Sequence, residues 1–240
     1  MAFVSKVVIA VLVSFESLQV AVAGSGHTKL PDAELRQYDG TDTTKPIYLA
    51  INGTIFDVSV SPSFYGPGGH YHHFVGRDAS RAWVTECWDS EEQLTWKMDG
   101  VEDMFMPKYL DEELEKASQG DPAAGLDLGP MSNEQVIKLA TEATAKFGKV
   151  SDKEKAKRLQ GDAVEARQRV HDTLAHWVKF FENNSKYSVA GYVVYDKDNS
   201  ENPPKLCEAA LKKRPLKGGK LDSLLNVGQV DKGYEGKDEL

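Results

Sequence analysis

The first half of the chain alternates short apolar runs with turn residues, a pattern typical of small strands and short helices. Residues 47–51 and 54–58 form two strand-like runs, and Asn52-Gly53 between them is a strong hairpin signal. Pro62 and the run Gly66-Pro67-Gly68-Gly69 then interrupt regular structure. Further short elements are expected as a helix or turn at residues 35–40 and as helices at residues 70–74 and 78–88.

The second half carries a helical period. Ser132 with Gln135 forms a capping-box pattern that opens a helix ending near Gly148, and Ser151 with Glu154 opens another. Apolar positions three, four or seven apart follow in the second helix, at Ala156, Leu159, Ala163, Val170, Leu174, Trp177, Val178 and Phe181. We expect this stripe to pack in the core or in a helix hairpin rather than to bind a partner.

The remaining segments have weaker patterns. We expect a loose lead-in over residues 24–34, irregular structure over 98–131 around a helix at 110–117, a break of the long helix at Gly161, a strand at 187–195, and a tail from 196 onward.

Composition narrows the function classes. The chain has 240 residues, of which 40% are hydrophobic and 28% charged, which excludes full-length disorder. A mean hydropathy of -0.46 excludes a polytopic membrane protein. The net charge of -8 disfavours nucleic acid as a partner, because an acidic surface repels phosphates.

The two ends of the chain predict the same compartment. Lys6, an apolar run over residues 7–13 and the small residues Ala21-Val22-Ala23 match a secretory signal peptide over residues 1–23. A membrane anchor is the alternative, although Glu16 would be costly inside a bilayer. The chain ends in Lys237-Asp238-Glu239-Leu240, the retrieval signal of the endoplasmic reticulum. We therefore expect residence in its lumen.

An oxidising lumen permits a disulfide between Cys87 and Cys207, the two cysteines of the chain. Two separate buried thiols are the alternative, because the distance between the two residues cannot be known from sequence. Two cysteines exclude a disulfide scaffold and a four-thiolate zinc site. Asn52 and Asn183 begin sequons and are candidate glycosylation sites.

Chemistry-bearing residues gather in residues 64–81, where glycines would let the backbone approach a flat ligand closely. The tyrosines Tyr65 and Tyr71 could face a metal or pack in the core. His70, His72 and His73 suggest zinc, but adjacent histidines point in different directions on regular backbone and no matching cysteine or acidic cluster is apparent. We therefore disfavour zinc, and the histidines are alternatively exposed beside a pocket.

This region resembles the membrane-associated progesterone receptor family, which includes neudesin and belongs to the cytochrome b5-like haem/steroid-binding domains. The resemblance is carried by Leu35-Arg36-Gln37-Tyr38-Asp39-Gly40, Tyr48-Leu49-Ala50-Ile51-Asn52-Gly53-Thr54-Ile55-Phe56-Asp57-Val58, Phe64-Tyr65-Gly66-Pro67-Gly68-Gly69 and Phe74-Val75-Gly76-Arg77-Asp78-Ala79-Ser80-Arg81, with Trp177 and Lys186-Tyr187 at the family's last helix and closing segment. It implies an α+β, cytochrome b5-like fold with an extra helical insertion.

The resemblance also implies a haem site. Cytochromes b5 use two axial histidines, one beside a His-Pro-Gly-Gly turn, whereas Gly66 takes that position here. The family uses a tyrosine phenolate, which maps onto Tyr71, and such a hard anion favours ferric iron. By the same resemblance Tyr65, Lys186 and Tyr187 line the site, and Lys186 suits a propionate of b-type, non-covalent haem. His72 or His73 are the alternative iron ligands.

The chain departs from the family pattern in three places. His70 stands where proline is usual, His72 and His73 follow Tyr71, and an insertion separates Trp88 from Lys186. The implied division is a domain over residues 30–195, interrupted by a helical insertion at about 98–165, and a C-terminal tail over 196–240.

The function expected from these observations is non-enzymatic haem binding, with steroid binding as a further property. One-sided ligation leaves the other haem face for a sterol, a lumenal protein or a second copy of the chain. The alternative is a haem-free binding or signalling module on the same fold. A component of electron transfer is the third reading, and it would need a separate reductase because no nucleotide-binding glycine motif is present.

Overall fold

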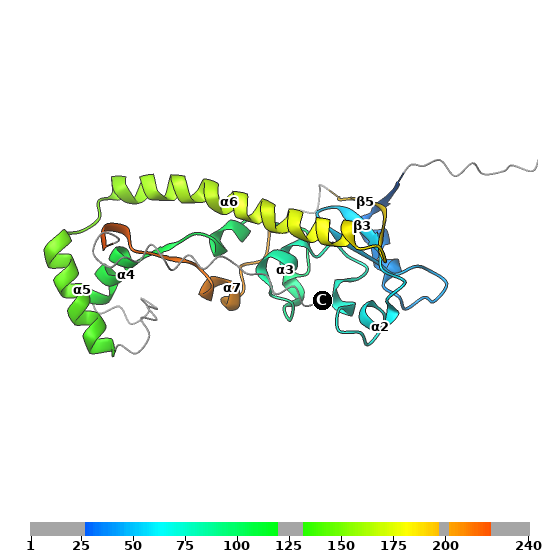
Figure 1. Cartoon of the computed structure of the whole chain (residues 1–240), viewed down its shortest axis with the longest axis horizontal. Helices are drawn as coiled ribbons and strands as arrows, with labels where there is room; N and C mark the ends of the chain where they lie inside the picture. The colour runs from blue at the N-terminus through cyan, green and yellow to red at the C-terminus, as the bar shows by residue number, and fades with distance from the viewer. Residues whose placement is uncertain (1–26, 120–131, 197–201, 222–240) are drawn as a thin grey trace, which may run out of the picture.

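The computed structural model describes residues 27–119, 132–196 and 202–221 (Figure 1). The molecule is elongated, with a small sheet and short helices at one end and a helical lobe at the other. The long helix α6 (Asp152–Asn183) runs along one side between them (Figure 1). The N-terminal segment 1–23 and the tetrapeptide at 237–240 lie outside the described residues. In the described ranges, no helix combines the length and the apolar character needed to cross a bilayer.

The main sheet has four strands in the order β1-β5-β3-β2. Their bounds are Thr28–Pro31 for β1, Tyr48–Ile51 for β2, Thr54–Asp57 for β3 and Ser188–Val194 for β5. The hairpin predicted at Asn52-Gly53 is confirmed, because β2 and β3 pair antiparallel and both turn residues have positive φ, 51° and 77°. β5 adds antiparallel to β3, so residues from the two halves of the chain share one sheet.

The expectation of a loose lead-in over residues 24–34 is wrong. Thr28–Pro31 forms the edge strand β1 and pairs in parallel with β5. The two strands approach so closely that a Cβ at Gly191 would lie 2.0 Å from the carbonyl oxygen of Thr28. The polar side chains of this edge strand hid it from a hydrophobicity pattern, because its pairing is made by backbone groups.

Short helices and 3₁₀ turns connect the strands. The helices nearest the sheet are α1 (Asp32–Leu35), α2 (Pro62–Tyr65) and α3 (Ser80–Thr85), and one of the 3₁₀ turns spans His72–Phe74. They cover a core whose largest fully buried side chains include Phe56, Phe74, Trp83 and Phe181. Burial of each such side chain contributes about 1.5–3 kcal/mol. Phe181 comes from α6, so the long helix is part of this core.

Helix α6 is continuous, so the predicted break at Gly161 is wrong. The helix begins where Ser151 accepts a hydrogen bond from the backbone N–H of Glu154. Its C-terminal part packs in the core, whereas its N-terminal part extends beyond it (Figure 1). The insertion boundary near residue 165 therefore falls inside one uninterrupted element.

The helical lobe lies around the N-terminal part of α6. Helix α4 (Leu110–Ser118) packs on α5 (Asn133–Phe147), which begins with the predicted capping box at Ser132. Arg158 of α6 donates to both carboxylate oxygens of Asp111 at 3.0 Å, and this bidentate ion pair fixes α4 against the long helix.

The segment expected to be a tail packs on the fold over residues 202–217, here called the strap. It contains α7 (Glu208–Lys212) and β6 (Leu216–Lys217), which pairs in parallel with β4 (Lys108–Tyr109). Ala210 of α7 is fully buried. A disulfide joins Cys207 of the strap to Cys87, across 120 positions and a Cα–Cα distance of 6.4 Å. The pairing that the sequence left open is therefore present.

Candidate functional site

The structure brings three of the four predicted site residues together. The ring of Tyr65 lies 5.9 Å from the ring of Tyr71 and 5.9 Å from that of Tyr187. We call these three residues the tyrosine cluster. Tyr65 is buried, whereas Tyr71 and Tyr187 are half-buried. Residues 116 positions or more apart in the sequence thus meet where α2 faces the end of α6.

The glycine-rich loop places Tyr71. Tyr65 ends α2, and the backbone then curls so that the N–H of Tyr71 donates to the carbonyl oxygen of Phe64 at 3.0 Å. A Cβ at Gly69 would lie 2.3 Å from that same oxygen, and one at Gly66 would lie 2.6 Å from the carbonyl oxygen of Pro62. The loop can close in this way only with glycine at both positions.

The end of α6 places Tyr187 and Lys186. The N–H of Tyr187 donates to the carbonyl oxygen of Asn184, and its ring packs 5.5 Å from that of Phe181. Lys186 is exposed, and among the described residues its ammonium group has no hydrogen-bond or ion-pair partner. Lys186 directly precedes Tyr187 of the tyrosine cluster in the chain.

The three phenols differ in their hydrogen bonding. Burial, the neighbouring phenol of Tyr187 and a hydrogen bond with it raise the pKa of Tyr65 far above its ordinary value. Tyr65 therefore stays neutral, while Tyr187 also lies 3.5 Å from the hydroxyl of Ser61. Within the described residues, the hydroxyl of Tyr71 has no hydrogen-bond partner. Of the three phenols, Tyr71 has the oxygen free for an external ligand.

The two histidines beside Tyr71 are directed to other groups. Nδ1 of His72 lies 3.0 Å from the carbonyl oxygen of Tyr65, and a carbonyl can only accept, so this nitrogen carries a proton. The ring of His73 packs against that of Phe74 at 4.1 Å with a tilt of 50°, and its Nε2 is buried without a partner among the described residues. In the described parts of the chain, no group of three or more His, Cys, Asp or Glu residues could hold a metal ion.

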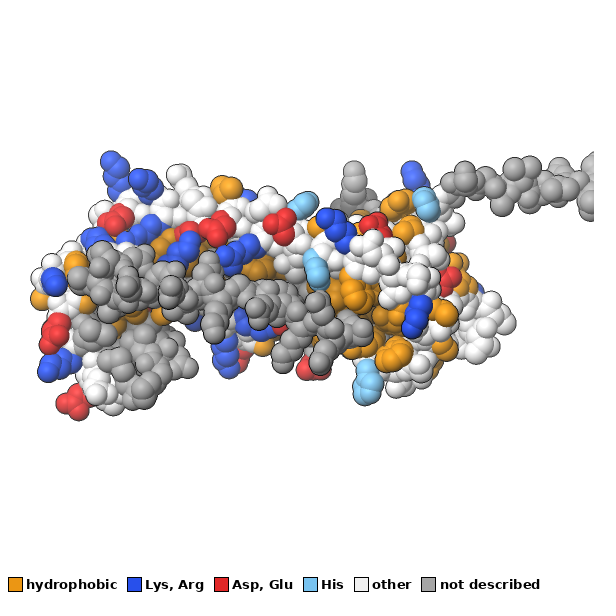
Figure 2. Space-filling model, in the orientation of Figure 1, with side chains coloured by type: hydrophobic (Ala, Val, Ile, Leu, Met, Phe, Trp, Pro, Cys, Tyr) orange, Lys and Arg blue, Asp and Glu red, His pale blue; other side chains and the backbone are white. Residues whose placement is uncertain are grey.

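Aromatic side chains that the sequence analysis did not assign to the site surround Tyr71. Rings of Phe64, Phe74 and Trp88 lie 6.4, 6.4 and 6.5 Å from its ring. Phe64 is 53% exposed although it is large and apolar. Figure 2 shows hydrophobic side chains gathered on this face, below the end of α6 and over α2 and α3. A sequence signal for two of these side chains was available, because Phe64 directly precedes Tyr65 and Trp88 directly follows Cys87.

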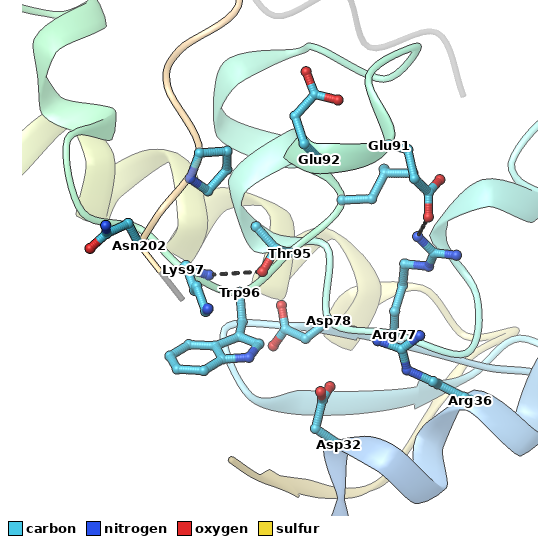
Figure 3. A pocket seen from close by; sticks show the side chains of 12 residues that line it. Asp32, Arg36, Arg77, Asp78, Glu91, Glu92, Thr95, Trp96, Lys97 and Asn202 are labelled. Carbon is cyan, nitrogen blue, oxygen red and sulfur yellow. Dashed lines mark hydrogen bonds and ion pairs between the residues drawn. The ribbon is translucent and has the colours of Figure 1, made fainter. Parts of the chain in front are cut away.

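A polar cavity of about 330 Å³ lies apart from these residues, and its lining includes none of the tyrosine cluster (Figure 3). Asp32 and Asp78 point toward one another across it, near Trp96 and Arg77 (Figure 3). Arg77 is paired with Glu91. Asp78 is 1% exposed and accepts hydrogen bonds from Gly53, Ser80 and Tyr195. Its carboxylate is therefore satisfied within the protein and fixes the hairpin to α3.

Both sequon asparagines are exposed. Asn52 lies in the turn of the hairpin, and Asn183 is the last residue of α6. Asn183 lies close in sequence to Lys186 and Tyr187, so a glycan there would flank the tyrosine cluster. Both sites stay predictions.

Comparisons with known proteins relate the first half of the chain to one family of domains. A family model described as "Cytochrome b5-like Heme/Steroid binding domain" matches residues 31–110. "Membrane steroid-binding protein 1" of Arabidopsis thaliana is 37% identical over 116 residues, which cover 44% of this chain and 52% of that protein. "Probable steroid-binding protein 3" of the same plant is 48% identical over 68 residues, covering 28% of this chain and 67% of that protein.

Two further similarities were found. A "Neuferricin homolog" of Caenorhabditis elegans is 48% identical over 67 residues, which cover 28% of this chain and 21% of that protein. A solved structure of a hypothetical Arabidopsis thaliana protein, described as having a cytochrome b5 like fold, is 27% identical. The match covers 71% of this chain and 94% of the chain in that solved structure, with a TM-score of 0.38. The chain spans about half the length, or less, of the membrane steroid-binding proteins it matches.

These relationships settle the classification that the sequence motifs predicted. The α+β, cytochrome b5-like fold is confirmed, with extra helices beyond the matched segment. That family is one of binding domains and is not a known enzyme family. This chain therefore belongs to the membrane-associated progesterone receptor family, with a cytochrome b5-like haem/steroid-binding domain.

Proposed function

We propose that this chain binds haem at the tyrosine cluster, with the oxygen of Tyr71 as the iron ligand. One observation supports this most strongly: Tyr71 is half-buried among aromatic rings, and within the described residues its hydroxyl has no hydrogen-bond partner. An oxygen held in this way can bind a ligand without first breaking an internal hydrogen bond.

The residues present fit a porphyrin by their chemistry. Flat rings offer apolar contacts, Tyr71 offers one hard donor, and the ammonium of Lys186 suits a carboxylate. Tyr65 remains a neutral phenol that cannot compete as an anion, because burial raises its pKa. Haem bound there would supply a ferric iron of low reduction potential. Tyr71 would hold the group through its phenol oxygen, and its half-exposed position would let the displaced proton pass to water.

A titration of the purified full chain with haemin tests this function. We expect a saturable ferric absorption spectrum and, for Tyr71→Phe, an affinity reduced by more than about 100-fold, because a directly bound ligand should matter more than the outer partners of a metal site. Tyr192→Phe is the matched control, since it removes a phenol oxygen at an exposed position of β5 outside the cluster. Unsaturable binding, or equal affinity in Tyr71→Phe, would refute the assignment.

A steroid is the second candidate ligand. The names of the plant relatives include steroid binding, and the apolar surface at Phe64 and Val60 is exposed beside the cluster. Titration of haem-free protein with progesterone, followed by tryptophan fluorescence, tests this candidate. Saturation without haem supports it, whereas steroid binding that requires haem assigns the steroid to the haem complex.

We further propose that the chain resides in the lumen of the endoplasmic reticulum. The disulfide between Cys87 and Cys207 supports an oxidising compartment. Protease protection in intact microsomes measures this directly. Digestion of the chain without detergent would place it on the cytosolic side and contradict the proposal.

One-sided ligation by Tyr71 would leave the opposite haem face for a partner, and a second copy of the chain is the partner we propose. Sedimentation with and without haemin distinguishes a haem-dependent homodimer from a monomer. A monomer in both samples would exclude the dimer and leave haem binding intact.

A further inference from the structure

Trp88 forms one wall of the tyrosine cluster. Its indole meets the ring of Tyr71 edge-on, at 6.5 Å and 83°, and meets Phe74 at 5.6 Å and 83°. Its Nε1 donates to the carbonyl oxygen of Ala82 at 3.2 Å. The position of the Tyr71 ring therefore depends on where the backbone at residue 88 is held.

Helix α3 contacts Trp88 through the carbonyl oxygen of Ala82, and the chain leaves the helix just before residue 88. The helix has six residues, Ser80–Thr85, and its C-cap Glu86 has a φ of 57°, in the left-handed region. A residue with a Cβ adopts this conformation at an energetic cost, which the bond from its N–H to the carbonyl oxygen of Ala82 helps to offset. Cys87 follows directly, is 6% exposed and is bonded to Cys207. The disulfide is thus the covalent restraint one residue before Trp88.

The strap, which contains Cys207, is also bonded to other parts of the fold. Arg81 is 1% exposed and donates to the carbonyl oxygen of Pro204 at 2.5 Å, while Gln93 donates to that of Lys205 at 2.7 Å. Lys213 forms an ion pair with Glu86, beside the disulfide. Leu206 and Cys207 pack against the same core as Tyr71, Phe74 and Trp88. The strap and the wall of the site form one packed unit.

We propose that Trp88 is a positioning residue for Tyr71 and that the Cys87–Cys207 disulfide controls it, so that haem binding weakens when the disulfide is reduced. In the reduction, a dithiol is oxidised to its own disulfide, the Cys87–Cys207 bond breaks, and each sulfur takes up one proton. Cys207 is half-buried and is the more exposed cysteine of the pair, since Cys87 is 6% exposed. This inference rests on the proposed binding of haem at Tyr71.

Hydrogen exchange of the haem-free full chain tests the coupling without any ligand. We compare wild type with Cys87→Ser/Cys207→Ser and measure peptides covering residues 64–74 and 202–217. The proposal predicts faster exchange in both segments of the serine variant. Faster exchange in 202–217 alone would show that the strap loosens without affecting the site, and would overturn the proposal.

Haemin titration of Trp88 variants tests the positioning role and does not depend on the disulfide variant folding. We expect Trp88→Ala to bind about tenfold more weakly, the loss typical of a partner that orients a metal ligand, and Trp88→Phe to restore most of the affinity. Trp96→Ala is the matched control, because Trp96 borders the polar cavity instead. Equal affinity in Trp88→Ala and wild type would contradict the inference. A wild-type chain that fails to bind haemin would refute the proposed function instead, while hydrogen exchange would still measure the coupling.

Discussion

The tyrosine cluster and the polar cavity differ in how their polar groups are paired. In the polar cavity, Asp78 accepts hydrogen bonds from three residues and Arg77 pairs with Glu91. In the cluster, Tyr71 has an oxygen with no partner in the described structure, and the exposed Lys186, next to Tyr187 in the chain, has an ammonium group with none there either. The first arrangement holds the fold together, and the second leaves donors for a ligand.

The difference shows why buried charge alone is a poor guide to function. Asp78 is the more buried and more strongly bonded residue, but every bond it makes is internal. Tyr71 is less buried and makes fewer bonds, and that is the condition a ligand needs. Substitutions on the polar side should therefore change stability, and substitutions on the tyrosine side should change binding.

The largest expected effect comes from the strap, which borders both regions. Removing the disulfide in Cys87→Ser/Cys207→Ser should lower the free energy of unfolding by about 4–5 kcal/mol, because the unfolded chain regains the entropy of a loop of 120 positions. Denaturant unfolding at low temperature measures this loss. A change below about 1 kcal/mol would mean that the strap is held by its other contacts.

Asp78→Ala tests the polar cavity, where a substitution should lower stability rather than haem binding. It leaves the N–H of Gly53, the N–H of Ser80 and the hydroxyl of Tyr195 without their acceptor, at a cost of about 3 kcal/mol. Burial is the largest cause of the raised pKa of Tyr195 and remains in this variant, so the phenol cannot compensate by ionising. The folded fraction should keep the wild-type haemin spectrum, and a lost spectrum with unchanged stability would reverse the roles of the two regions.

Lys186→Ala should weaken haemin binding and leave stability unchanged, which is the reverse of the effect expected for Asp78→Ala. Haemin affinity should fall roughly fivefold, as for a single exposed ion pair, and the loss should shrink at high salt. Thermal unfolding of the haem-free chain should stay unchanged, since the ammonium has no partner there. Lys29→Ala, on the exposed edge strand, is the control variant. Equal losses in both variants would indicate only a general effect of net charge.

The smallest effect is a dependence of stability on pH at His73, which packs on Phe74 between the two regions. Burial lowers the pKa of His73 below its ordinary 6.5. Because the unfolded chain then binds the proton more readily, His73 favours the folded state fully above pH 6.5 and less as pH falls through the folded-state pKa. His73→Gln should flatten this slope in chemical denaturation, whereas His70→Gln, at an exposed position, should not.

The sequence was sufficient to predict elements that depend only on neighbouring residues. The Asn52-Gly53 turn and the Ser132 capping box each depend on a few adjacent residues, and both occur as predicted. The edge strand β1 was missed because its pairing with β5 joins residues more than 160 positions apart. The break predicted at Gly161 is absent because the neighbouring turns of α6 maintain the helix across one glycine.

The family motifs identified Tyr65, Tyr71, Lys186 and Tyr187 as candidate site residues. Of these, the three tyrosines do lie together. The sequence did not reveal that Trp88 closes the cluster or that Asp78 is bonded to Tyr195. Both contacts depend on how α3 and the strap pack, which is a property of the whole fold.

Resonance Raman spectroscopy of the ferric haem complex tests most directly whether the oxygen of Tyr71 binds iron. We predict vibrations of an iron-bound phenolate in the wild-type chain and their loss in Tyr71→Phe. A spectrum of imidazole ligation that persists in Tyr71→Phe and disappears in His72→Ala or His73→Ala would contradict the account.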